Sequence, residues 1–125
     1  MMLGKGILGL SALVFMAYGL ISLVSPAVPA GFAGIVMSNG NAFAEVGAMY
    51  GGLQTGVGGF CLLAVLRPEF YRAGLALLVI GIGAMTLARL VSLLMATDAV
   101  TAYTYGALIY EFMTALLAAV ALARK

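Results

Sequence analysis

The stretch Ile7–Val24 is ILGLSALVFMAYGLISLV, 18 residues without one charged side chain. Its apolar residues form a continuous run instead of the spaced face of an amphipathic helix, which is typical of a helix surrounded by hydrocarbon. About 20 helical residues cross the roughly 30 Å apolar core of a bilayer. The run is also longer than the core of about 7–15 residues in a secretory signal peptide, so we predict a retained first membrane span.

Three more segments of similar length and apolar character follow, and they are Ala42–Leu66, Ala73–Ala96 and Ala102–Ala123. Helices satisfy their backbone hydrogen bonds internally, which hydrocarbon requires. Only 8% of the residues are charged, whereas soluble domains carry about 25%. We therefore predict the all-α class, as an integral membrane four-helix bundle that forms a single domain over residues 1–125.

The connections between these spans differ in composition. Ser25–Asn41 holds two prolines and three glycines, which predict a non-helical or broken segment. Arg67–Arg72 is expected to be a short charged turn and Thr97–Thr101 a short polar one. Asn41 and Thr101 precede spans and have side chains that cap helices, so each is a candidate N-cap.

The basic residues predict the orientation of the chain. They precede the first span, fill the second connection and follow the last span, at Lys5, Arg67, Arg72, Arg124 and Lys125. The other two connections contain neither Lys nor Arg. Because positively charged loops stay in the cytoplasm, we predict a multi-pass protein of the inner (plasma) membrane with both termini cytoplasmic.

The second predicted span carries six glycines that divide between two helix faces. One face holds Gly52, Gly56 and Gly59 together with Glu45, and the other holds Gly47, Gly51 and Gly58 together with Gln54. Small residues let helix backbones approach closely in membranes. We therefore predict helix packing through both faces, with this helix at the centre of the bundle. A ligand groove along either face is the alternative.

Three ionisable residues fall inside the spans, namely Glu45, Arg89 and Glu111. From the helical rise, they lie about 5, 10 and 13 Å below the outer ends of their helices. A lone charge at the centre of the membrane costs about 3 kcal/mol on insertion scales. An arginine cannot escape that cost by losing its proton. We therefore predict that Arg89 pairs with Glu111, with Glu45, or with both.

Polar neighbours extend these charges into a candidate site. Ser92 lies one turn from Arg89, and Tyr50 and Gln54 share a face of the second span. The predicted cluster, either ligand-binding or structural, is Glu45, Tyr50, Gln54, Arg89, Ser92 and Glu111. The structural alternatives are a clasp between two helices, and a glutamate that simply favours the positive end of its own helix.

The composition argues against several other kinds of site. The chain has no histidine and one cysteine, so we expect no metal site. No cofactor motif is present, so we expect no cofactor. A net charge of +2 is too small to predict nucleic acid as a partner.

Several short motifs together resemble one protein family. They are Asn41–Gly58 (NAFAEVGAMYGGLQTGVG), Arg67-Pro68, Arg72-Ala73-Gly74, Arg89-Leu90-Val91-Ser92, and Glu111 in the last span. This combination, over nearly the whole chain, resembles the bacterial domain of unknown function 4345 family. The resemblance implies a small four-helix membrane protein of bacteria, loosely similar to the DoxX-like group. Val46 departs from the family pattern, which often has arginine there.

Three classes of function fit these features. The first is a non-catalytic binding or accessory protein, with a membrane lipid, a larger membrane complex or a homo-oligomer as its partner. The second is an oligomeric transporter or channel for a proton or small polar solute, although no pair of interrupted helices is evident. The third is an acid/base enzyme acting on a membrane-soluble substrate, with a glutamate and Tyr50 transferring protons.

Overall fold

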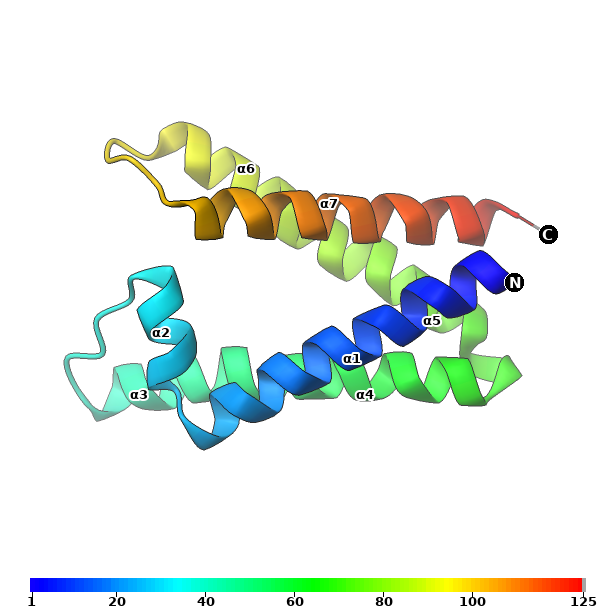
Figure 1. The fold of residues 1–125 in the computed structure, drawn as a ribbon, viewed down its shortest axis with the longest axis horizontal. Coiled ribbons are helices and arrows are strands. Elements are labelled where there is room, and N and C mark those ends of the chain that lie inside the picture. The colour runs from blue at the N-terminus through cyan, green and yellow to red at the C-terminus, as the bar shows by residue number, and fades with distance from the viewer. Residues whose placement is uncertain (125) are drawn as a thin grey trace. The chain divides into compact units, whose positions relative to one another are not determined.

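The computed structural model describes residues 1–124, which form helices joined by short connections (Figure 1). Within these residues, four helices are long and apolar enough to cross a membrane: α1 (Met2–Val24), Gly40–Leu66, Pro68–Met95 and α7 (Ala102–Ala123). The predicted all-α class with four helices of spanning length is confirmed. Lys125, one of the five basic residues that predict the orientation, lies outside the described residues.

The second and third spanning helices are each built from several parts. The second consists of α3 (Gly40–Val46), the π-helical η1 (Gly47–Gly52) and α4 (Leu53–Leu66). The third consists of the 3-10 helix η2 (Pro68–Phe70), α5 (Tyr71–Leu77), the π-helical η3 (Leu78–Ile82) and α6 (Gly83–Met95). Both helices continue through their π-helical turns. The interruptions expected of transporters are unwound breaks, and a π-helical turn is a milder change.

The connection Ser25–Asn41 contains a helix, α2 (Ala27–Ala33), where a non-helical or broken segment was expected. Pro29 lies in the first turn of α2, where a missing N–H costs nothing because those N–H groups lack helical partners anyway. The helix ends at Gly34, which adopts the left-handed conformation with φ 73° and donates its N–H to the carbonyl of Ala30. The prolines and glycines therefore delimit a short helix.

The helix caps also differ from those expected. The N-cap of α3 is Asn39, whose side-chain oxygen accepts a hydrogen bond of 2.9 Å from the N–H of Ala42. The prediction that Asn41 is the N-cap is therefore wrong. Thr101 does precede α7, but its side chain makes no capping hydrogen bond. Its backbone carbonyl instead accepts a bond from the N–H of Thr104, at 3.1 Å.

The turn between the second and third spanning helices is shorter than predicted. The second helix ends at Leu66, as expected, but the third begins at Pro68 instead of Ala73. Proline is favoured at the first position of a helix because its φ is already helical. Arg67 is thus the one residue between the two helices, and it forms an exposed ion pair of 2.7 Å with Glu69.

The chain divides into two compact units. One contains Met1–Leu8 and the chain from Ala64 onward, and the other contains Gly9–Leu63. We call them the C-terminal unit and the N-terminal unit. The single-domain organisation stays a prediction, and each unit is described by itself below.

In the N-terminal unit, α1 packs closely against η1 and α4 through glycines. A Cβ atom added to Gly51 would lie 2.8 Å from the Cα of Leu23, and one added to Gly58 would lie 2.6 Å from the backbone N of Met16. Gly19 of α1 makes a similar approach to Thr55. These positions have no room for a side chain, so glycine permits the contact between the two helices.

The opposite glycine face of the same helix is open. Within the N-terminal unit, a Cβ atom added to Gly52, Gly56 or Gly59 would meet no neighbouring helix within 4 Å. Within the N-terminal unit, α1 packs against the Gly51 and Gly58 face alone, and packing through both faces stays a prediction. A helical projection identifies two small-residue faces, but it contains no information on which face meets a neighbour.

In the C-terminal unit, α7 packs against α5, η3 and α6. Figure 1 shows α6 turning back into α7, and the two run beside each other. Leu75 and Leu78 are completely buried within this unit. Large apolar side chains such as Ile80 and Ile109 are exposed on the outside of the helices. Exposed apolar surface of this kind suits a helix that meets lipid.

Candidate functional site

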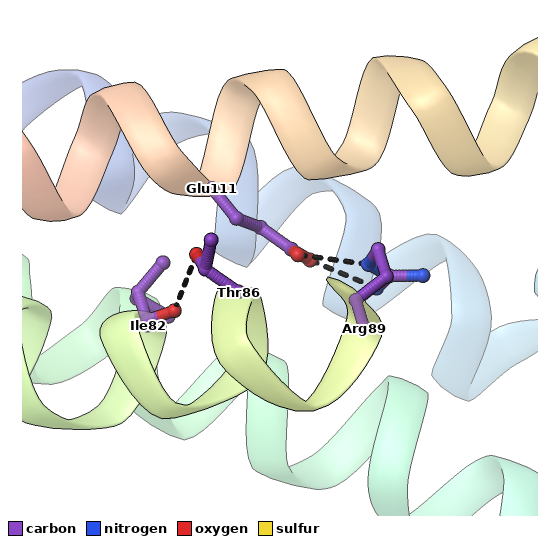
Figure 2. A network of polar contacts seen from close by, with 4 residues as sticks. All are labelled: Ile82, Thr86, Arg89 and Glu111. Atoms are coloured by element: carbon purple, nitrogen blue, oxygen red, sulfur yellow. Dashed lines mark hydrogen bonds and ion pairs between the residues drawn. The ribbon is translucent and has the colours of Figure 1, made fainter. Parts of the chain in front are cut away.

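Arg89 of α6 and Glu111 of α7 form a two-pronged ion pair (Figure 2). The Nε of Arg89 donates to Oε1 of Glu111 at 2.8 Å, and Nη2 donates to Oε2 at 2.9 Å. Both carboxylate oxygens therefore accept from one guanidinium. This parallel geometry is among the strongest that ion pairs adopt, because each hydrogen bond is charge-assisted and the two planar groups match. Glu111 is one of the two partners expected for Arg89.

The spacing of buried residues on α7 explains why Glu111 faces α6. Glu111, Thr114, Ala118 and Ala121 are the buried residues of α7, and they recur every three or four positions. Residues at this spacing share one helix face. Because alanine and threonine are small, that face approaches its neighbours closely and carries the carboxylate with it.

Thr86 lies one turn before Arg89 on α6 and is buried. Its hydroxyl donates to the carbonyl of Ile82, the last residue of η3, at 2.9 Å (Figure 2). A π-helical turn disturbs the regular pairing of backbone groups, and a threonine hydroxyl can satisfy one of them. Thr86 thus supports the helix directly below the ion pair and does not extend the polar site.

A pocket of about 490 Å³ adjoins the ion pair at the end of α6 and α7 that carries their connecting turn. Its lining residues are Met85, Ala88, Arg89, Ser92, Leu93, Ala96, Val100 and Thr104. Three of them, Arg89, Ser92 and Thr104, offer polar side chains, and the others are apolar. The pocket therefore combines a few polar groups with an apolar wall, which is the usual composition of a small-molecule site.

The two members of the ion pair differ in exposure. The side chain of Glu111 is 7% exposed, whereas that of Arg89 is 27% exposed and lies in the wall of the pocket. The carboxylate is consequently held behind the guanidinium. A molecule in the pocket would meet hydrogen-bond donors of Arg89 whose charge Glu111 already compensates.

A second pocket, also of about 490 Å³, lies between η3, α6 and α7. Its walls are almost entirely apolar, with Gly83, Leu87 and Phe112 among the lining residues. The α6 residues of the first pocket and those of the second lie on opposite faces of the helix by their spacing. Of these two pockets, only the first has a charged residue, Arg89, in its lining.

Three of the other members of the predicted cluster belong to the N-terminal unit. Glu45 is exposed at the end of α3, and Tyr50 and Gln54 are half-buried in η1 and α4. Ser92 is exposed on α6 and lines the first pocket with Arg89. Of the six predicted residues, the structure therefore brings together Arg89, Glu111 and Ser92.

Thr104 is a pocket residue that was not singled out from the sequence. It lies seven positions before Glu111, so the two residues share a face of α7 two turns apart. The cluster predicted from the sequence includes no residue of the last span other than Glu111. The signal was present in the spacing, but the pocket also depends on the course of the turn Ala96–Thr101, which spacing does not reveal.

The fold and this site define an all-helical protein with four helices of membrane-spanning length and a charged pair between the last two. The chain belongs to the family described as domain of unknown function (DUF4345), whose model matches residues 3–122. The family resemblance noted from the motifs is thereby confirmed, whereas the looser likeness to the DoxX-like group is not. The chain matches no curated protein and no solved structure.

Proposed function

We propose that this protein is a non-catalytic binding or accessory protein of the bacterial inner membrane, with both termini in the cytoplasm. Its ligand is a lipid-like molecule whose headgroup occupies the pocket beside Arg89. The observation that supports this proposal most directly is the charge-compensated guanidinium in the wall of a pocket that is otherwise mainly apolar.

The composition of the pocket supports a lipid-like ligand. Its apolar residues suit hydrocarbon, and its polar side chains, Arg89, Ser92 and Thr104, can orient a headgroup. Exposed apolar side chains such as Leu94 and Met95 lie at the same end of α6. A molecule dissolved in the membrane meets such a surface without leaving the bilayer.

The geometry of the ion pair favours binding over acid/base catalysis. Both oxygens of Glu111 accept hydrogen bonds from Arg89, and the carboxylate is almost fully buried. A general base must reach the proton that it removes. Glu111 faces Arg89 instead of the pocket, which suits a residue that fixes the orientation of the guanidinium.

Native mass spectrometry of the full chain, purified in mild detergent, tests the proposal. A bulky residue in the wall, Ala96→Trp, is expected to fill the pocket and to abolish retention of a small molecule that the unchanged protein carries. The matched control is Ala99→Trp in the same turn, because Ala99 is exposed and is not among the lining residues. Retention of the same molecules by Ala96→Trp would contradict a role for the pocket.

A further inference from the structure

We infer that the pocket beside Arg89 selects an uncharged headgroup with hydrogen-bond acceptor oxygens, such as ester or ketone carbonyls, over an anionic one. This inference rests on the proposed binding function and specifies its ligand class. The presence of an arginine would ordinarily favour a phosphate or carboxylate. The charges around this arginine reverse that expectation.

The first argument is the charge balance of α6, α7 and the turn that joins them. Between Ala73 and Ala123 the side chains that are charged at neutral pH are Arg89, Asp98 and Glu111. One positive and two negative groups leave this part of the chain with a net charge of −1. An anionic headgroup would therefore enter a region that already has an excess of negative charge.

The second argument is the way in which the arginine is paired. Glu111 accepts two hydrogen bonds from the guanidinium, so the pair is locally neutral, and the carboxylate side chain is only 7% exposed. An added anion would share the guanidinium with Glu111 and leave one negative charge uncompensated. Burying an uncompensated charge is costly, because little water remains to solvate it.

The third argument is the chemistry of the groups in the wall. A guanidinium only donates hydrogen bonds, whereas the hydroxyls of Ser92 and Thr104 donate and accept. A cationic headgroup would find a like charge in Arg89. An uncharged headgroup with carbonyl or hydroxyl oxygens can accept from Arg89 and exchange bonds with both hydroxyls. The apolar lining, including Leu93 and Val100, suits the carbon atoms that follow such a headgroup.

The test compares lipids that differ in headgroup charge. The full chain in detergent is titrated with dioleoylglycerol, with dioleoylphosphatidylglycerol and with a decyl-substituted benzoquinone, and the bound fraction is measured by native mass spectrometry. The first two share their acyl chains, so their difference reports the headgroup. We expect an uncharged probe to bind roughly tenfold more tightly than phosphatidylglycerol, which corresponds to about 1.4 kcal/mol. The two uncharged probes distinguish ester from quinone carbonyls.

Pocket variants separate this inference from the proposed function. Thr104→Val keeps the shape of the side chain and removes its hydroxyl, so it is expected to weaken binding of the uncharged probe several-fold. Thr97→Val is the matched control, because Thr97 is exposed in the nearby turn and does not line the pocket. Far-UV circular dichroism verifies that both variants remain helical.

The outcomes are distinguishable. Tighter binding of phosphatidylglycerol that is weakened by Thr104→Val would overturn the inference on charge and leave the proposed function intact. If neither Thr104→Val nor Ala96→Trp changed the binding of any of the three probes, the inference and the proposed function would both be overturned. Tighter binding of an uncharged probe that is weakened by Thr104→Val and unchanged by Thr97→Val would support the inference and the proposed function.

Discussion

Two helix pairs in this molecule are held together by opposite means. In the N-terminal unit, α1 meets η1 and α4 at Gly51 and Gly58, where the backbones approach so closely that no methyl group fits. In the C-terminal unit, α6 meets α7 through two long charged side chains, Arg89 and Glu111. The first contact consists of backbone against backbone, and the second of side chain against side chain.

This difference bears on where the proposed ligand can be accommodated. Close contact between helix backbones is stabilised by dispersion and leaves no space for a ligand between the two helices. A charged pair needs room for its own atoms, and the helices that carry it border a pocket of about 490 Å³. The glycine pair therefore suits a rigid support, and the Arg89–Glu111 pair suits the binding part of the molecule.

The largest expected loss of stability comes from a substitution at the contact between Gly51 and α1. In Gly51→Leu, the new side chain would meet the Cα and N of Leu23, which are backbone atoms that cannot rotate away. We expect a loss of about 3 kcal/mol or more in the free energy of unfolding, measured by denaturation of the purified protein in detergent micelles.

The adjacent glycine provides the control. Gly52→Leu makes the same chemical change one residue along, where an added Cβ atom would meet no neighbouring helix of the N-terminal unit within 4 Å. We expect its unfolding free energy to stay near that of the unchanged protein. Equal losses in the two variants would contradict a decisive role for the contact with α1, because helix propensity alone favours leucine over glycine.

A double-mutant cycle on the charged pair should give the next largest effect. Arg89→Ala leaves Glu111 buried without its partner, so we expect a loss of about 3 kcal/mol in the free energy of unfolding. Glu111→Ala should cost a similar amount, because a guanidinium cannot become neutral. The double variant should lose less than the sum of the single ones, with a coupling of about 2 kcal/mol. Additive losses would mean that the two side chains contribute independently.

Replacing a glycine by alanine should change the free energy of unfolding in opposite directions in the two helix pairs. In Gly58→Ala the methyl group would lie 2.6 Å from the N of Met16, whereas in Gly83→Ala it would lie 3.9 Å from the Cβ of Ala115, an ordinary contact. We expect Gly58→Ala to destabilise by about 1–3 kcal/mol. Gly83→Ala should stabilise by about 0.5–1 kcal/mol, because alanine favours a helix. Thermal unfolding of both variants in the same detergent measures the signs.

Much of the fold could be predicted because the governing rule is local. The length and apolarity of a segment predict a spanning helix, and four such helices are present in residues 1–124. The partner of Arg89 was narrowed to two glutamates by the cost of an unpaired charge in hydrocarbon. The structure pairs it with Glu111.

The features that were missed depend on geometry between segments or on small energy differences. The choice between the Gly51 face and the Gly52 face depends on where α1 lies, which no projection of one helix contains. The π-helical turns η1 and η3 lie inside continuous helices, where such turns usually occur, so the length and apolarity of a span do not reveal them. The pocket depends on the turn between α6 and α7, and such turns follow tertiary packing.

The smallest expected change in stability concerns the residues that precede α3 and α7. Asn39 caps α3 through its side chain, but Thr101 makes no side-chain cap on α7. Asn39→Ala should therefore cost about 1 kcal/mol, as is usual when a capping side chain is removed. Thr101→Ala should stay within about 0.5 kcal/mol of the unchanged protein. Hydrogen exchange of the amide of Ala42, which donates to Asn39, offers a local measure. Faster exchange is expected in Asn39→Ala, and an unchanged rate would mean that this cap adds nothing to the start of α3.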